Sequence, residues 1–550
     1  MEIVKDERTY EGLHVVPAMV MAMMEEVGIR ELIDERCSGP DRCRHKLSAG
    51  MAVKALVGGM VERGKRPLYR MVDYYSTAPT DLLFGDGVGN RSLSDTILAG
   101  RLDDVFQTDT RSLLKDSYDL LKKRYGFDGD CLFMDATNYT MYGEKYLKSQ
   151  LEHDLALTGV VAKESPMPAH GGNAKDGHND RVQMNLSHVV DGNGIPICSQ
   201  SYDGNTSDIS MNEDMIGYLS KTMDLRSYIL MADCKMCVED LLKRLMDLGT
   251  GFVTKVPSNF NDTLRDTVVT SVLSGRMDGN PSRPGRLHYE TRDRMDGRIL
   301  RVIAYMTPRN RKDSERFIRE KGLRTVEKRL DVQSRKRYHC ERDALEAFRE
   351  VLAKSPADCY TADPVVFRDR AASKRHGDGR EYRVRSENIR IDESRFEQAV
   401  VTHALQVLVT NLPFSATHSD DVHTKASADD VIDLYLELYK VEAGFKMMKS
   451  GMNIADVYIH TPSRITAVAF VVSLATMICK TMDHILNAGK PKGERARTVK
   501  VLADLHANTL IRYDRSHDRM TVMGHPGATT DVFTLLERLS VDPLFLLGHR

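Results

Sequence analysis

The chain has 550 residues, which is too long for a single hydrophobic core and predicts two to four domains. Its composition, 41% hydrophobic and 29% charged, is that of a globular protein and excludes a largely disordered chain. The formal net charge of −1 shows no global basicity. A DNA-binding protein is not excluded, because phosphate neutralisation needs only a local basic face.

Three features predict where the protein is found. The nine cysteines are scattered and odd in number, as expected of a reduced cytosolic chain. The first residues, Met-Glu-Ile-Val-Lys-Asp-Glu, lack the basic-then-apolar order of a signal peptide. The longest apolar run, Ile465–Cys479, is too short to cross a bilayer and predicts a buried core helix. We therefore expect a cytoplasmic protein with no membrane partner.

Residues 1–125 are expected to be mostly helical. Ser94 is a candidate N-cap before Asp95. The glycine run Gly85–Gly89 lacks the spacing of a phosphate-binding loop and predicts a turn. The expected helices are Ala18–Glu26, Ser48–Arg63, Ser94–Phe106 and Asp109–Tyr125.

After Phe127 the pattern changes to short apolar and alternating segments. The expected strands are Cys131–Ala136, Gln183–Val190, Ile195–Tyr202, Tyr228–Ala232 and Gly251–Val256, with helices at Asp214–Met223 and Val238–Leu248. The residues Asp191-Gly-Asn-Gly194 predict a hairpin turn. The order strand, strand, strand, helix, strand, helix, strand is typical of an RNase H-like core, an α/β fold with a mixed sheet. It is one of few topologies that fit.

Beyond Val256 this pattern stops for well over a hundred residues. Between Arg309 and Arg342 there are 13 Lys or Arg against 6 Asp or Glu, a local excess of seven (13 − 6). Alternating segments at Ile299–Tyr305 and Tyr382–Val384 predict a β-rich insertion with basic helical pieces. A strand at 404–409 is expected to return to the core.

Three acidic residues stand out. Asp135 and Asp233 each end an apolar run, so we expect both at strand ends. A helix from Asp429 to Lys449 carries Tyr435, Glu442 and Lys449 at intervals of seven, which places them on one stripe. Taken alone, Glu442 and Lys449 are ordinary exposed charges. Together the three acids predict a divalent-metal site for phosphodiester chemistry.

The start of this last helix is indicated by a capping-box spacing between Ser427 and Asp430, and Gly451 offers a stop. Glu442 is therefore expected in the middle of a rigid helix.

Other metal-like residues support no site of their own. Cys234 and Cys237 have metal-ligand spacing, but no second such pair completes a zinc site. His170, His178 and His188 lie near the expected core strands without HExxH spacing, and we expect satisfied polar or surface roles for them.

Several short motifs, in chain order, resemble those of the DDE transposases of bacterial and archaeal insertion sequences. Phe133–Tyr139 and Ile229–Met236 are similar to the strands that carry the family's two aspartates. Ala174–Asn185 resembles its lysine-and-arginine strand entry, and Gly204–Asp208 its hairpin exit. Leu408–Asn411 precedes the last helix, as in the family. The spacing of Tyr435, Glu442 and Lys449 matches the Tyr-Arg-Glu-Lys signature, except that Leu438 stands in place of the arginine.

The resemblance implies a transposase that cleaves DNA at the ends of an insertion sequence and transfers the strands into target DNA. Asp135, Asp233 and Glu442 would be the catalytic residues and would hold two Mg²⁺ ions, with Mn²⁺ as a substitute. The implied DNA-binding residues are Tyr435, Lys446, Lys449, Lys175 and Arg181. The implied partners are the terminal inverted repeats, the target DNA and a second copy of the chain in a synaptic complex. The expected location is the prokaryotic nucleoid.

The expected domains are a helical N-terminal region that binds DNA ends (1–125), a first core part (126–256), the basic β-rich insertion (257–400), a second core part (401–486) and a C-terminal tail (487–550). Two alternatives remain. One is a decayed or domesticated DNA-binding protein, which Leu438 mildly favours and the three intact acids disfavour. The other is a structure-specific nuclease without strand transfer, which the large basic insertion disfavours.

Overall fold

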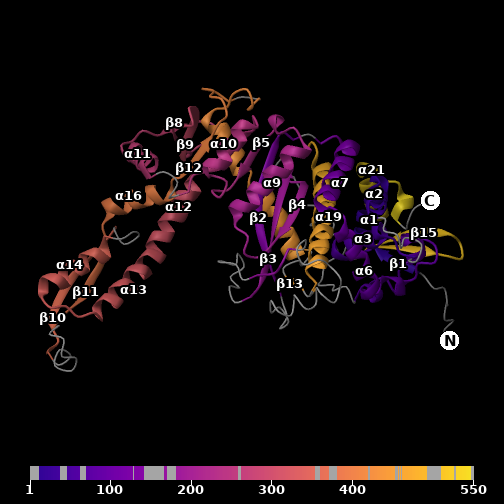
Figure 1. Cartoon of the computed structure of the whole chain (residues 1–550), viewed down its shortest axis with the longest axis horizontal. Helices are drawn as coiled ribbons and strands as arrows, with labels where there is room; N and C mark the ends of the chain where they lie inside the picture. The colour runs from indigo at the N-terminus through magenta and orange to yellow at the C-terminus, as the bar shows by residue number, and fades with distance from the viewer. Residues whose placement is uncertain are drawn as a thin grey trace. The chain divides into compact units, whose positions relative to one another are not determined.

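The computed structural model describes residues 11–37, 46–61, 70–127, 129–141, 166–169, 181–257, 262–353, 359–370, 381–418, 421–451, 456–457, 459, 461–491, 509–524 and 528–546. The chain divides into two compact units. Unit 1 comprises Met1–Met236, Asp247–Thr250 and Leu436–Arg550, and unit 2 comprises Cys237–Met246 and Gly251–Tyr435. Figure 1 shows their elements.

Unit 1 begins with the predicted helical region. Its helices are α1 (Val15–Val27), α2 (Ile29–Arg36), α3 (Ala49–Val61), α4 (Met71–Tyr74), α5 (Thr80–Phe84), α6 (Asp95–Gln107) and α7 (Thr110–Tyr125). The four expected helices are confirmed as α1, α3, α6 and α7. Asp109 caps α7, its carboxylate accepting hydrogen bonds from the amides of Arg111 and Ser112. Ser94 occupies the N-cap position of α6 without a side-chain cap bond.

Helix α19 (Pro462–Asn487) is the central helix of unit 1 and contacts α3, α6 and α7. It extends beyond the predicted apolar run at both ends, and several of its buried hydroxyls donate to carbonyls of the same helix. Ser473 and Thr476, for example, donate to the carbonyls of Ala469 and Val472. By length and composition α19 could cross a membrane, yet 94% of its most apolar stretch is buried in the protein. The predicted core helix is confirmed.

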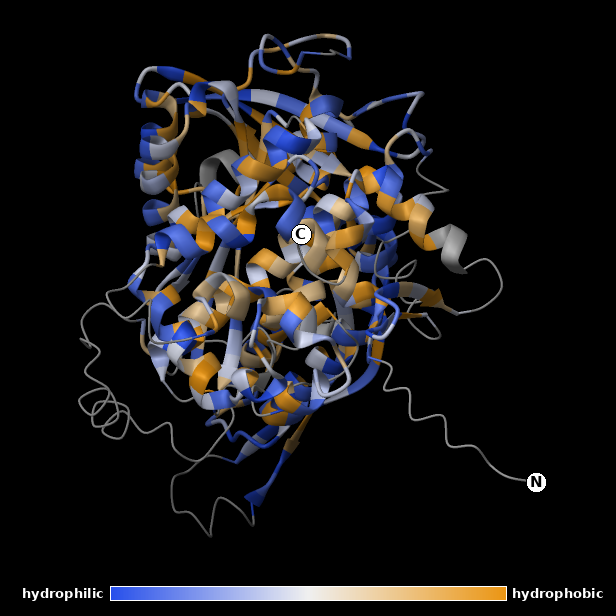
Figure 2. Ribbon diagram, turned by 90° about the vertical axis from the view of Figure 1, so that its right-hand side faces the viewer, coloured by the Kyte–Doolittle hydropathy of each residue, from blue (hydrophilic) through white to orange (hydrophobic). Residues whose placement is uncertain are grey.

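Most other helices are amphipathic, which determines the side that each one turns towards the core. In Figure 2 single helices carry blue segments beside orange ones, as expected where one side is buried and the other is exposed.

A small sheet joins segments far apart in the chain. Strand β1 (Glu11–His14) pairs antiparallel with β14 (Leu510–Asp514), which pairs with β15 (Arg519–Met523). Helix α21 (Ala528–Leu539) and the short η8 (Pro543–Leu546) contact α1. Arg515 strengthens the connection through ion pairs with Glu11 (2.8 Å) and Asp81 (2.5 Å).

The main sheet of unit 1 has the strand order β4-β3-β2-β5. These strands are β2 (Cys131–Met141), β3 (Gln183–Asp191), β4 (Pro196–Tyr202) and β5 (Ile229–Ala232). Strands β2, β3 and β4 are antiparallel neighbours, whereas β5 and the two-residue β13 (Asp456–Val457) run parallel to β2. Helix α9 (Asp208–Thr222) contacts β2 and β3. This hairpin followed by a parallel strand is the arrangement that the sequence predicts for the first core strands.

The predicted turn between β3 and β4 is closed by a buried carboxylate. Asp191 Oδ1 accepts hydrogen bonds from the amides of Asn193 (2.8 Å) and Ile195 (2.9 Å). Gly194 adopts a φ of +79°, which favours glycine.

Unit 2 contains a second set of strands and the long insertion. Its strands are β6 (Gly251–Lys255), β7 (Asp278–Gly279), β8 (Leu287–Met295), β9 (Arg298–Met306), β10 (Tyr360–Arg368), β11 (Tyr382–Ile391) and β12 (Gln406–Thr410). Their order is β6-β12-β9-β8-β7, with β10 and β11 as a separate ribbon. The helices are α10 (Glu239–Asp247), α11 (Asp262–Leu273), α12 (Pro308–Phe317), α13 (Leu323–Ser334), α14 (Glu341–Leu352), α16 (Glu393–Ala404) and α17 (Ala428–Leu436).

Candidate active site

Asp135 lies on β2, and Asp233 directly follows β5, the parallel strand beside it. Met134 of β2 pairs with Ala232 of β5, so the next residue on each chain is the aspartate. Adjacent strands are about 4.8 Å apart, which places the two acids at the same level. Both are half-buried. One oxygen of each accepts a backbone hydrogen bond, from Ala136 in the case of Asp135 (2.7 Å) and from Lys235 in the case of Asp233 (2.9 Å).

The two strand predictions have different outcomes. Asp233 directly follows β5, as expected. Asp135 was expected at a strand end but lies within β2, which continues to Met141. The reason is that the later residues pair fully with β3, and their polar groups are satisfied: the Asn138 amide bonds Gln183, and the Tyr139 hydroxyl lies 3.2 Å from that of Ser201.

The expected continuous helix from Asp429 to Lys449 is interrupted. Its start is confirmed, because Ser427 and Asp430 form the reciprocal capping box, with bonds of 2.8 and 3.2 Å. Helix α17 then ends at Leu436, and α18 (Tyr439–Lys446) begins after a turn. A π-helix, η6 (Met447–Gly451), follows. Glu442 therefore lies in the first turn of α18 rather than in the middle of a long helix.

A tertiary contact holds the chain just after this interruption. The ammonium of Lys440 bonds the carbonyl of Gly192 in the β3–β4 turn and pairs with Glu437 at 2.7 Å. It also lies over the ring of Phe133, 5.4 Å from its centroid. Local sequence gives no signal for this contact, since the chain from Asp429 to Lys449 has a helical pattern throughout. Lys440 is the positioning residue that the sequence did not reveal.

Helix α18 lies at the level of the aspartate pair. The ring of Phe445 packs on that of His188, with centroids 5.3 Å apart. His188 is the cross-strand partner of Asp135, and directly opposed residues project from the same face of a sheet. Glu442 precedes Phe445 by three residues, so it lies within one helical turn of that contact. Its side chain is exposed.

The acids do not close into one cluster. Within the described residues no group of three or more His, Cys, Asp or Glu side chains lies close enough to hold a metal ion. Like charges repel one another, which favours separation of the glutamate from the two aspartates. The donor set itself fits a hard divalent cation, because all three groups offer carboxylate oxygens and two are already juxtaposed.

The candidate DNA-binding residues are dispersed. Lys446 ends α18 and is exposed, whereas Lys449 lies in η6 and is half-buried. Tyr435 belongs to α17, in unit 2. Arg181 precedes β3, whose residue His188 is the cross-strand partner of Asp135. The first residue of β3, Gln183, is five residues or about 17 Å from His188 along the strand, and Arg181 is farther still. Lys175 lies outside the described residues, as do His170 and His178.

The remaining metal-like residues form no metal-holding group within the described part of the chain. Cys234 and Cys237 are not joined by a disulfide. His188 is buried, and its Nε2 lies 2.9 Å from the Ser473 hydroxyl on α19, which confirms a satisfied polar role.

His188 also makes stability depend on pH. It is 1% exposed, and burial lowers its pKa to about 3. In the unfolded chain the imidazole gains a proton below about pH 6.5, whereas in the folded protein it stays neutral until about pH 3. Its contribution to stability is therefore present above pH 6.5 and is lost as the pH falls from 6.5 towards 3.

We expect this residue to remove about 2 kcal/mol from the free energy of unfolding between pH 7 and pH 5. The measurement is urea unfolding at both pH values in wild type and His188→Asn. The variant loses packing at both, so the diagnostic quantity is the difference between the two pH values. That difference should shrink by about 2 kcal/mol; an unchanged difference would assign the acid sensitivity to other groups.

The protein has a mixed α/β fold in which the register of β2 and β5 brings two carboxylates, Asp135 and Asp233, next to each other. Residues 126–478 match the family model described as "Transposase DDE domain", and the chain belongs to this family. Residues 15–117 match a model described as a domain of unknown function (DUF4277). The predicted resemblance to DDE transposases is thus confirmed.

The chain was also compared with curated proteins and with solved structures. A search among curated proteins found no match. Among solved structures, the piggyBac transposase in a cryo-EM structure of its synaptic complex with hairpin DNA is similar over 98% of this chain and 88% of that chain, at 10% identity and a TM-score of 0.39.

Proposed function

We propose that this DDE transposase cleaves DNA at the ends of an insertion sequence and joins the freed ends to target DNA. The observation that carries the proposal is the register of β2 and β5, which sets Asp135 beside Asp233, in a chain of this family. The location of α18, with Glu442 one turn from the His188 contact, supports the third acid.

The proposed roles follow from the chemistry of the side chains. Asp135, Asp233 and Glu442 would hold two Mg²⁺ ions, which supply activation of the attacking water and stabilisation of the departing 3′ oxygen. The ammonium groups of Lys446 and Lys449 bind phosphate as point charges. The hydroxyl of Tyr435 donates a hydrogen bond to the DNA backbone. In the second step the freed 3′-OH attacks the target, and no covalent bond between protein and DNA forms.

Several finer points belong to the same proposal. The partners are the terminal inverted repeats and the target DNA, and a homodimer brings two ends together. The protein acts at the nucleoid. The helical region at 1–125 binds the ends.

The test uses the DNA that flanks the reading frame. Inverted repeats bounded by short direct duplications are expected there. The purified protein should cleave a duplex that carries one such repeat when Mg²⁺ is present, and a scrambled repeat should remain intact. Binding of the repeat without cleavage under Mg²⁺ or Mn²⁺ would instead support the alternative, a catalytically decayed DNA-binding protein in which Leu438 replaces the signature arginine.

A further inference from the structure

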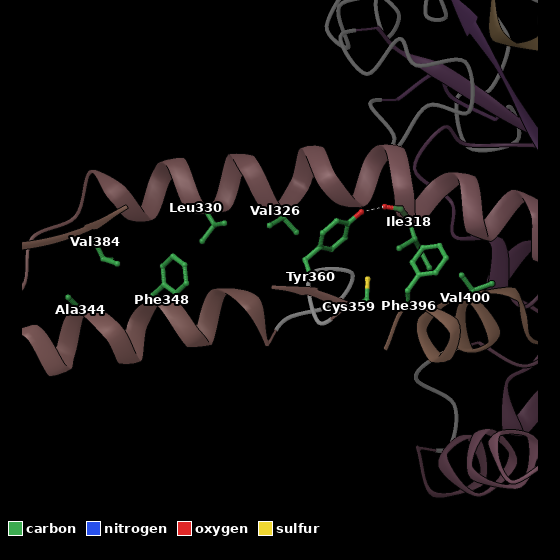
Figure 3. Close-up of a cluster of buried hydrophobic side chains, with 10 residues drawn as sticks. All are labelled: Ile318, Val326, Leu330, Ala344, Phe348, Cys359, Tyr360, Val384, Phe396 and Val400. Atoms are coloured by element: carbon green, nitrogen blue, oxygen red, sulfur yellow. Dashed lines mark hydrogen bonds between the residues drawn. The ribbon is translucent and has the colours of Figure 1, made fainter. Parts of the chain in front are cut away.

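The basic segment of unit 2 forms one long helical element with a π-turn in its middle. Helix α12 continues through the π-helix η4 (Ile318–Gly322) into α13. A π-turn accommodates one extra residue, which turns the following helix back by about 100° relative to an uninterrupted α-helix. Figure 3 shows the resulting continuous ribbon.

The extra residue keeps one side of this element on the core. Ile318 at the start of the turn and Val326 and Leu330 after it all belong to the same buried cluster. Without the π-turn, Val326 and Leu330 would be rotated about a quarter turn away from the side on which Ile318 is buried. The hydroxyl of Tyr360, itself buried, donates to the Ile318 carbonyl at 2.6 Å and so satisfies an acceptor at the turn.

The rotation introduced by the π-turn also aligns the cations on the exposed side of α12 and α13. When each residue is counted as about 100° and the extra residue of the π-turn is left out of the count, six cations fall within a narrow stripe opposite the buried side. Five of them are exposed within the helices, and Arg335 is exposed at the C-cap of α13. The stripe cations are Arg309, Lys312, Arg316, Arg324, Lys328 and Arg335. Without the extra residue, the cations of α12 and α13 would lie on different faces.

The stripe retains free positive charge. Asp313 pairs with Arg309 and Arg316, and Asp331 pairs with Arg335. Lys312, Arg324 and Lys328 have no ion-pair partner among the described residues. Two cations outside the stripe are paired with α16: Arg311 pairs with Glu397, and Arg319 pairs with Glu393.

We propose that this stripe, phased by the π-turn at Ile318–Gly322, binds the phosphate backbone of duplex DNA. The inference rests on the proposed function and adds a surface to it. From Arg309 to Arg335 the stripe is about 40 Å long, which spans roughly one turn of the double helix. A straight row of cations suits a polyanion with a charge every ~1.7 Å along its axis. Because the contacts are to phosphate, they contribute to affinity without sequence preference.

The experiment measures the salt dependence of binding to a fluorescent 30-base-pair duplex of arbitrary sequence. The stripe variant is Arg324→Gln/Lys328→Gln on α13. The matched control is Arg342→Gln/Arg349→Gln, two exposed arginines on α14. Each lost phosphate contact lowers the slope of log K against log salt by about 0.9. The stripe variant should therefore lose about 1.8 from its slope, and the control should keep the wild-type slope.

A gain-of-charge variant tests the stripe independently of any damage to folding. Val332 is 49% exposed and lies beside the stripe, about 40° around the helix from Lys328. Val332→Lys should steepen the slope by about 0.9. Equal slopes for wild type, both double variants and Val332→Lys would overturn the stripe and leave the proposed function standing. Absence of salt-dependent duplex binding by the wild type would overturn both.

Discussion

Replacement of Asp135, Asp233 or Glu442 by alanine is expected to abolish Mg²⁺-dependent DNA cleavage and to leave binding of the DNA ends largely intact. Each change removes a carboxylate from the proposed metal site but no cation from the DNA-binding surfaces. We expect the cleavage rate to fall about a thousandfold or more, equivalent to roughly 4 kcal/mol of transition-state stabilisation. The measurements are the single-turnover cleavage rate and, separately, the Kd for an end duplex.

The matched control is Glu213→Ala, which removes an exposed carboxylate from α9 in the same unit. It should cleave at the wild-type rate. A Glu442→Ala variant that still cleaved DNA would refute the role of α18 in catalysis. If only the two aspartate variants were inactive, another acid would have to complete the site.

Lys54→Met is expected to have the largest effect on stability. The side chains of Lys54 and Glu25 are 0% and 1% exposed, and they pair at 2.5 Å between α3 and α1. Lys54 also donates to the carbonyl of Leu83 at 2.8 Å. Removal of one partner leaves a buried carboxylate with less compensation, which costs about 3–5 kcal/mol. Hydrogen exchange of amides in α1 and α3 measures this cost directly.

The double variant Lys54→Met/Glu25→Gln is the control for this interpretation. It removes the negative charge of Glu25, which the single variant leaves buried without Lys54, while Arg30 keeps its partners Glu31 and Asp34. Most of the lost stability should return. Burial alone would raise the pKa of Glu25, but the ammonium of Lys54 and the guanidinium of Arg30 hold it below its ordinary value. A single variant as stable as wild type would mean that the pair contributes nothing to folding.

The sequence predicts those parts of the fold that local patterns determine. The helical pattern before Phe127 located α7, the apolar run Ile465–Cys479 located α19, and the turn residues Asp191 to Gly194 located the β3–β4 hairpin. The extent of β2 was not predictable in this way. Its second half is held by pairing with β3, whose partner residues lie more than forty positions along the chain, as between Thr140 and Gln183.

In the candidate site, too, some features follow from local sequence and others from contacts between distant residues. The residue types and their order indicated the two aspartates, and the strand pairing places them side by side. The start of α18 is fastened by Lys440 to Gly192, a contact between residues 248 positions apart. The π-turn at Ile318–Gly322 likewise has no local signature, because its stability comes from packing of Ile318 and Val326 and from the Tyr360 bond. Tertiary contacts thus decided the features that composition and periodicity could not.

The pairing of β1 with β14 has a consequence for synthesis of the protein. Leu13 pairs with Ile511, 498 positions later, and α1 is further covered by α21 and η8. A ribosome releases α1 and α3 long before these partners exist, whereas the β2–β3–β4 hairpins can form as they emerge. Almost the whole chain must therefore be synthesised before the last apolar surface of the helical region is covered. A chain that stops before Leu510 would expose the buried methionines of α1, and chaperones and proteases would recognise it as unfinished.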